Sequence, residues 1–297
     1  MKIELGTVGL GLLSLLLATS GGAVELGAPT TQYTALLKQY STASGGIRTA
    51  KTDEQRRKHV ERLGKFPARF LALAEKHPKD PVALKAIRQA IQAIGSTDSA
   101  SQIAWEINHA NFPVGITDDS PGKVVALLRR EHLQSNGLGP VIDRMRYGYR
   151  MEFEKFLRTV LRENSHREMQ GLANLALARF LNDRLRAIQL AADRPGMAEF
   201  YQKVFGGNYL PELKKRQQGG MAKEIEKLFE QATKYPDVKT PRGSTVAAQA
   251  RMELHGIRHL SVGKVAPDIK GPDQDGQTFK LSDYRGKVVL LYFWMEY

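Results

Sequence analysis

The chain has 297 residues, of which 42% are hydrophobic and 25% are charged, as expected for a folded protein with one large or two modest domains. It contains no cysteine, which excludes disulfides, thiolate metal ligands and thiol catalysis from these 297 residues. The net charge is +13, but acidic residues interrupt the basic ones and no block of like charge occurs, so we interpret the excess as solvated helix faces and expect no nucleic-acid partner.

The N-terminus has the features of a secretory signal peptide. Lys2 precedes an apolar run from Val8 to Ala18 that is too short to span a bilayer, and small residues follow it. We expect residues 1–23 to be removed by cleavage after Ala23, with no stable membrane insertion afterwards. The mature protein is then expected to be secreted or to lie in the periplasm or cell envelope. An uncleaved membrane anchor is the alternative.

The region from Tyr33 to Leu260 has a helical pattern throughout, and we assign residues 24–257 to an α-helical domain. Apolar residues recur at spacings of three and four, which places them on one face of a helix. Two such stripes are Leu84, Ile87, Ile91, Ile94 and Leu177, Leu181, Leu185, Ile188. Helix starts are expected at Asp80-Pro81 and Ser120-Pro121 and at a capping box over Ser165–Glu168.

Two stretches of this region look like copies of one unit. Phe70–Pro78 followed by Val82–Ile91 parallels Leu228–Pro236 followed by Val246–Leu254, and Phe156–Glu163 followed by Met169–Leu181 is a poorer third copy. A helix, a turn and a second helix rich in small residues is typical of tetratricopeptide-like hairpins, although no regular 34-residue period occurs. The pattern predicts a mainly α, helical-repeat-like bundle, and we expect this domain to bind a protein.

The helical region offers few residues for chemistry. Its seven histidines are scattered and form no His-Glu-x-x-His motif. Only His255 and His259 lie one helical turn apart, and two ligands without a nearby carboxylate favour no metal site. Trp105 is expected in the core. We predict no metal, no cofactor and no catalytic residue in this region.

The last part of the chain, residues 258–297, changes to a strand-and-turn pattern. Pro267 limits the start of an edge strand, Asp275-Gly276 supplies a tight hairpin turn, and Leu281–Tyr284 forms a short helical turn. Val288–Trp294 is almost uniformly apolar, as in a strand buried on both faces. A calcium loop at Asp273–Gly276 is disfavoured because its later oxygen ligands are missing.

In this order, Val262–Ile269, Asp273–Lys287 and the following Phe-Trp strand resemble the opening of a redoxin domain over about 36 residues. That thioredoxin-like family contains alkyl hydroperoxide reductase/thiol-specific antioxidant proteins and TlpA-type thiol-disulfide reductases. The resemblance implies the first β-hairpin and strand of a thioredoxin-like α/β domain, followed in the family by Cys-x-x-Cys. Phe293, Trp294 and Tyr297 would then lie beside the redox loop, and the partner would be a protein thiol or disulfide.

The resemblance implies that Tyr297 stands directly before the position of the first family cysteine. We therefore expect an exported thiol-disulfide oxidoreductase of the redoxin class that is inactive as given. Three explanations for the stop remain open: a UGA selenocysteine codon misread as a stop, a nonsense mutation, or a fragment. The alternatives for function are a secreted helical-repeat binding or scaffold protein with a degenerate redoxin remnant and, more weakly, a basic envelope-associated protein.

Overall fold

The computed structural model describes residues 27–47, 49–109, 111–293 and 295. The expected signal peptide at residues 1–23, together with Trp294 and Tyr297, lies outside them. The described helices of the body are α1 (Pro29–Ser44), α2 (Asp53–Gly64), α3 (Phe66–Lys76), α4 (Val82–Ile107), α5 (Ser120–Leu127), η1 (Leu128–His132), α6 (Gly139–Met145), α7 (Met151–Glu163), α8 (Arg167–Asp193), α9 (Pro195–Phe205), α10 (Tyr209–Gln218), α11 (Met221–Ala232) and α12 (Val246–His259).

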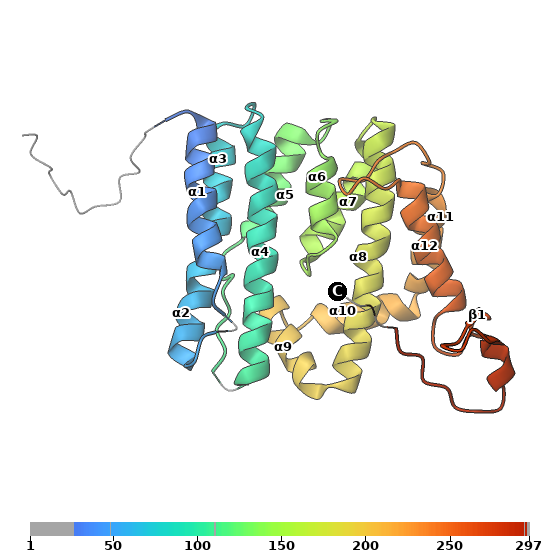
Figure 1. Cartoon of the computed structure of the whole chain (residues 1–297). Coiled ribbons are helices and arrows are strands. Elements are labelled where there is room, and N and C mark those ends of the chain that lie inside the picture. Colours follow the sequence, from blue (N-terminus) through green and yellow to red (C-terminus); the bar gives the residue numbers. More distant parts are fainter. Residues whose placement is uncertain (1–26, 48, 110, 294, 296–297) are drawn as a thin grey trace, which may run out of the picture.

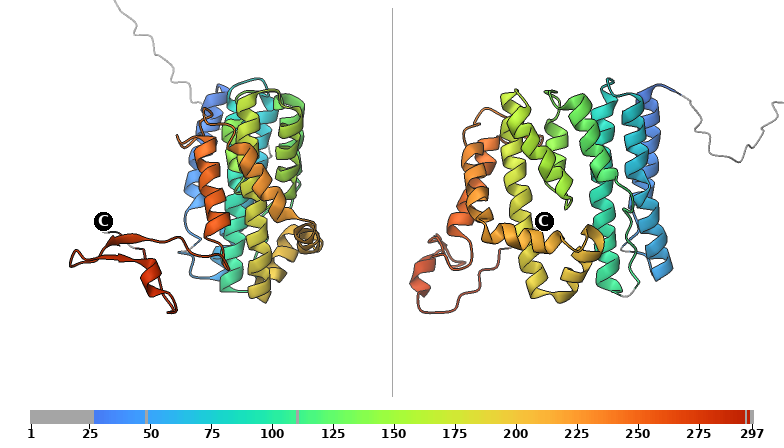
Figure 2. Two further views of the ribbon diagram at one scale, coloured as in Figure 1. Left: turned by 90° about the vertical axis from the view of Figure 1, so that its right-hand side faces the viewer. Right: turned by 180° about the vertical axis from the view of Figure 1, so that it is seen from behind.

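The long helices stand side by side and form one helical body, as predicted (Figure 1). Helix α4 packs mainly against α1, α2 and α3 and also contacts α5, α6 and α9, whereas α8 contacts α6, α7 and α9 to α12. Helix α10 runs across the long helices in both Figure 1 and the rear view of Figure 2. The two longest helices, α4 and α8, therefore organise the N-terminal and C-terminal halves of the body.

The hairpins expected from the repeated pattern are present. Helices α3 and α4, α7 and α8, and α11 and α12 follow each other in the chain and pack together; the first two connections are short, and the third spans residues 233–245. Their facing sides are apolar: Phe70, Phe156 and Phe229 are completely buried. The stripes at three- and four-residue spacing thus face the core, because a helix brings such residues to the same side.

The starts of α4, α5 and α8 differ from the expected ones: α4 begins at Val82 with Pro81 as its N-cap, and the Asp80 carboxylate accepts the Val82 N–H at 2.8 Å. At α8 the predicted box over Ser165–Glu168 is absent, and Asn164 binds the start of the helix instead: its side-chain oxygen accepts the His166 N–H at 2.8 Å, and its backbone oxygen accepts from the Gln170 side chain at 2.9 Å. Ser120 lies inside α5, one residue after the N-cap Asp119. A Thr52–Gln55 capping box at α2 was not predicted, although it has the usual signature of two reciprocal bonds.

The C-terminal segment contains β1 (Lys270–Pro272), β2 (Thr278–Lys280) and the 3-10 helix η2 (Leu281–Tyr284). The two strands pair antiparallel, with Lys270 opposite Lys280. Gly276 has a φ of +76° in the turn, which confirms the predicted hairpin, whereas Asp275 keeps a negative φ. Instead, the Asp273 carboxylate accepts from the backbone N–H groups of Asp275 and Gln277 at 3.0 and 2.7 Å.

The prediction of a strand over Val288–Trp294 was wrong for residues 288–293, which the structure describes. Residues 287–293 have no strand assignment, and residues 288–293 are exposed. A strand requires a neighbour that accepts and donates its backbone hydrogen bonds, and the described residues place none beside this segment. The left view of Figure 2 shows the C-terminal segment projecting away from the helices. Among the described helices, none is long and apolar enough to cross a membrane.

Candidate functional site

The C-terminal segment is held together by its own polar contacts. The Asp268 carboxylate accepts from the Ser282 backbone N–H at 2.8 Å and from its hydroxyl at 3.0 Å, and these bonds lower the pKa of Asp268. Ile269 accepts the Leu281 N–H at 2.9 Å, and Asp283 accepts the Lys280 N–H at 2.9 Å. The segment before β1 is thereby tied to η2, and the hairpin lies between them.

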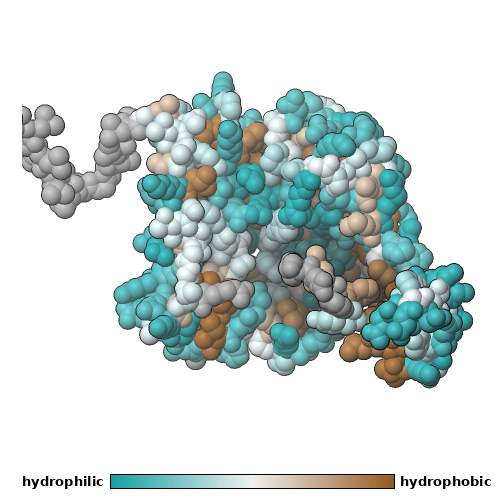
Figure 3. Space-filling model, viewed as in Figure 1, coloured by the Kyte–Doolittle hydropathy of each residue, from teal (hydrophilic) through white to brown (hydrophobic). Residues whose placement is uncertain are grey.

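The apolar end of the segment has no cover within the described residues. Val288, Leu290 and Tyr292 are 104%, 90% and 82% exposed. Figure 3 shows apolar side chains at the surface of the lower right, where this segment hangs below the helices. A run of exposed apolar side chains of this kind is unusual for the surface of a monomeric protein.

The residues expected beside a redox loop are only partly described. Phe293 is exposed and contacts no core cluster, while Trp294 and Tyr297 lie outside the described residues. The placement of these three residues around a redox loop therefore stays a prediction.

The histidine pair predicted to share a helix face does so. The rings of His255 and His259 lie 4.9 Å apart between centroids on α12. The described residues contain no group of three or more His, Cys, Asp or Glu side chains that could hold a metal ion. Trp105 is 1% exposed and stacks on His109 at 4.6 Å, which confirms its place in the core.

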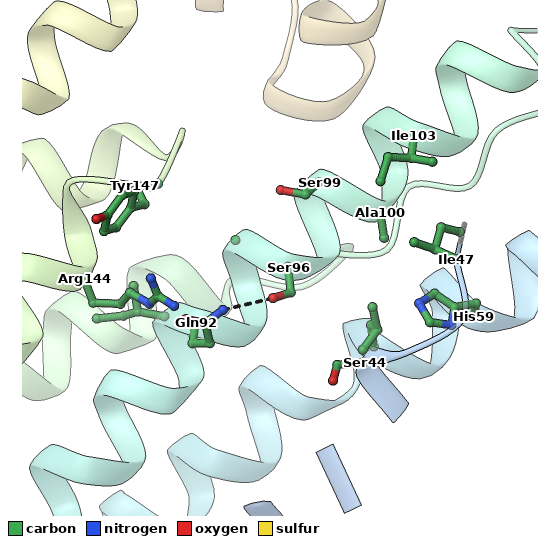
Figure 4. A pocket seen from close by; sticks show the side chains of 14 residues that line it. Ser44, Ile47, His59, Gln92, Ser96, Ser99, Ala100, Ile103, Arg144 and Tyr147 are labelled. Carbon is green, nitrogen blue, oxygen red and sulfur yellow. Dashed lines mark hydrogen bonds between the residues drawn. The ribbon is translucent and has the colours of Figure 1, made fainter. Parts of the chain in front are cut away.

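A pocket in the helical body, lined by both polar and apolar side chains, was not predicted from the sequence. It lies between α2, α4 and the end of α6 and has a volume of about 340 Å³. Figure 4 shows Arg144 and Tyr147 at one end, His59 at the other, and Gln92, Ser96 and Ser99 along α4 between them. Gln92, Ser96 and Ser99 share one face of α4 by their spacing of four and three, but nothing in the sequence indicates that His59 and Arg144 lie beside that face.

The comparisons with known proteins concern the C-terminal segment alone. Residues 262–297 match the family model of the AhpC/TSA family. The C-terminal segment is redoxin-related. The match begins just after α12 and includes the hairpin, η2 and the exposed apolar stretch. No curated protein and no solved structure matches the chain.

Proposed function

We propose that this protein is an exported thiol-disulfide oxidoreductase of the redoxin class, with a helical body that positions the redox domain or recruits its partner. The match of residues 262–297 to the AhpC/TSA family carries this proposal. Two further features support it. The β1–β2 hairpin is held by the bond from Ser282 to Asp268, and the apolar residues after it are exposed, as expected for the first part of a larger α/β domain.

The proposed chemistry needs groups that these 297 residues do not contain. A thiolate or selenolate attacks one sulfur of a substrate disulfide, forms a mixed disulfide and releases the other sulfur as a thiolate. A second thiol then displaces the substrate, so the substrate gains two electrons and the enzyme becomes oxidised. The chain has no cysteine, so both groups would have to follow Tyr297.

The codons after Tyr297 test the proposal directly. UGA followed in frame by a short spacer, a cysteine codon and the remainder of a redoxin domain would support it. A cysteine codon at that position, with the same continuation, would support it as well. UAA, UAG or unrelated sequence would contradict it. The product of the complete reading frame should reduce insulin disulfides in the presence of dithiothreitol, and the chain ending at Tyr297 should not.

Export is tested separately. If residues 1–23 form a signal peptide, mass spectrometry of the secreted or envelope protein should find Val24 at the N-terminus. An intact Met1 in that fraction would contradict cleavage.

A binding role for the helical body is the second candidate, because the pocket between α2, α4 and α6 lies in the body and outside the redoxin-related segment. This role does not depend on thiol chemistry. Ligand binding by the chain ending at Tyr297 would therefore support it even if the redox proposal failed.

A further inference from the structure

The pocket of the helical body contains the positive charge of Arg144, for which the nearby Asp143 carboxylate provides only part of a counter-charge. Within the described residues, Arg144 forms no ion pair, and its guanidinium lies 5.4 Å from the centre of the Tyr147 ring. The adjacent Asp143 pairs with Arg146 at 3.1 Å. Burial and nearby Arg88 lower the pKa of Arg144 and so destabilise its cation, and Asp143 only partly offsets this. Arginine nevertheless stays protonated in proteins, and an anion beside it would relieve that destabilisation.

The opposite end of the pocket presents a buried hydrogen-bond donor. His59 is 5% exposed, and burial together with Arg62 lowers its pKa, which keeps the ring neutral. Its Nδ1 lies 3.5 Å from an Arg62 nitrogen. Because a guanidinium can only donate, Nδ1 accepts and the ring proton belongs on Nε2. Nε2 has no partner among the described residues and almost no accessible surface, so a ligand oxygen reaches it only when a neighbouring side chain moves aside.

Ser96 provides a further donor between these ends. Its oxygen accepts from the Tyr40 hydroxyl at 2.8 Å and from Gln92 Nε2 at 3.2 Å, which leaves the Ser96 proton free to be donated. Among the described residues, the lining of the pocket contains no Asp or Glu. Apolar side chains, including Ile91 and Ala100, line the wall between the donors. Hydrogen-bond donors at both ends of the pocket, with an apolar wall between them, favour a ligand that has acceptor oxygens at its two ends and an apolar middle.

We propose that this pocket binds a small organic carboxylate with an apolar body and a second acceptor oxygen at its far end. The carboxylate pairs with Arg144 and accepts from Ser96, and the far oxygen accepts from His59 Nε2. The apolar body lies along α4. This site is independent of the redox chemistry proposed above.

Isothermal titration of the full chain with 4-acetylbenzoate, benzoate and hexanoate tests the proposal. At least one carboxylate should bind with a Kd below about 1 mM, in the range where a single small-molecule site is measurable. The neutral methyl ester of 4-acetylbenzoate has the same body without the charge. It should bind at least about tenfold more weakly, since a hydrogen bond to a charged group contributes about 1.5–3 kcal/mol.

Two variants test the proposal separately, one by removing the positive charge and one by reducing the volume of the pocket. Arg144→Gln removes the charge and should weaken carboxylate binding about tenfold or more. Gly95 lies on α4 in the pocket wall, and a Cβ there would meet no atom within 4 Å, so Gly95→Leu should fill the pocket without loss of the charge and should abolish binding. Matched controls are Arg186→Gln, at an exposed ion pair with Asp183, and Gly256→Leu on α12.

His59→Leu tests the far end. It should remove the advantage of 4-acetylbenzoate over benzoate and leave benzoate affinity within about twofold, because benzoate has no oxygen to place there. Circular dichroism melting of every variant verifies the fold. Three results would each overturn the proposal: no carboxylate bound, ester and acid bound equally, or both pocket variants equal to their controls.

Discussion

Arg150 donates to both carboxylate oxygens of Asp98, at 2.6 and 3.1 Å, and so joins the middle of α4 to the start of α7. Asp98 is 3% exposed. Burial raises the pKa of this carboxyl, and the Arg150 charge opposes that rise. The Arg150 guanidinium also lies 4.9 Å from the Phe205 ring on α9. One side chain therefore connects three parts of the body.

We expect Asp98→Asn to lower the free energy of unfolding by about 3–5 kcal/mol, because it leaves the Arg150 charge buried without its partner. Urea unfolding followed by circular dichroism measures the loss. Glu54→Gln, at the exposed Glu54–Lys58 pair, is the control and should change stability too little to resolve. Equal midpoints for the two variants would show that the buried pair contributes nothing.

Gly64 at the end of α2 allows a backbone contact that no other residue permits. A Cβ at this position would lie 1.9 Å from the Gly115 carbonyl oxygen. Gly64→Ala should therefore lower stability by about 1–3 kcal/mol, the usual cost of overpacking. Gly256→Ala is the matched helical control, since a Cβ there meets no atom within 4 Å, and it should raise stability by about 0.5–1 kcal/mol. Thermal melting that ranks them in the opposite order would contradict the close contact.

His132 makes stability depend on pH. Burial lowers the pKa of His132 below 6.5, and Glu131 only partly offsets this. As the pH falls through about 6.5, the unfolded chain takes up this proton before the folded one, so the free energy of unfolding decreases. The stability that the neutral His132 ring contributes is fully present at pH values above the pKa of His132 in the unfolded chain.

His132→Gln should consequently reduce the loss of stability between about pH 7.5 and pH 5.5. The test compares urea midpoints of both proteins across this range, so that other titrating groups cancel in the difference. Parallel pH profiles for the two proteins would rule out His132 as a contributor.

The helical body should fold without the C-terminal segment. The described residues after Lys264 pair among themselves in β1, β2 and η2 and contribute nothing to the buried core. A chain ending at Leu260 should melt within about 2 °C of the full chain, because no packing is lost. It should also aggregate less, since the exposed apolar stretch is removed. Light scattering and circular dichroism measure both, and a markedly lower melting temperature would reveal contacts from the segment to the body.

Local patterns were sufficient to predict the helices and their hairpins. The stripe Leu84, Ile87, Ile91 and Ile94 predicts a buried helix face because the spacing itself determines which residues share a side. The Gly276 turn was predictable for the same reason, since a positive φ favours glycine within a short window.

Contacts between distant residues were not predictable in this way. Asp98 and Arg150 are 52 positions apart, and neither has a neighbour in sequence that marks it as paired. The start of α8 was misassigned because Asn164 and Ser165 are both good cap residues, and the side chain of Asn164 also donates to the Leu133 backbone at 2.6 Å. The pocket at Arg144 and His59 depends on how α2 and α6 meet α4.

The contacts of α4 also bear on the order in which the body can assemble. Helices α1 to α4 contact one another within the first part of the chain, before any residue of α8 is needed. A polypeptide that emerges from the ribosome with its N-terminus first can therefore pack helices α1 to α4 together early, because contacts between residues close in sequence form quickly. The later helices then have a preformed surface on which to dock, and the C-terminal segment emerges last.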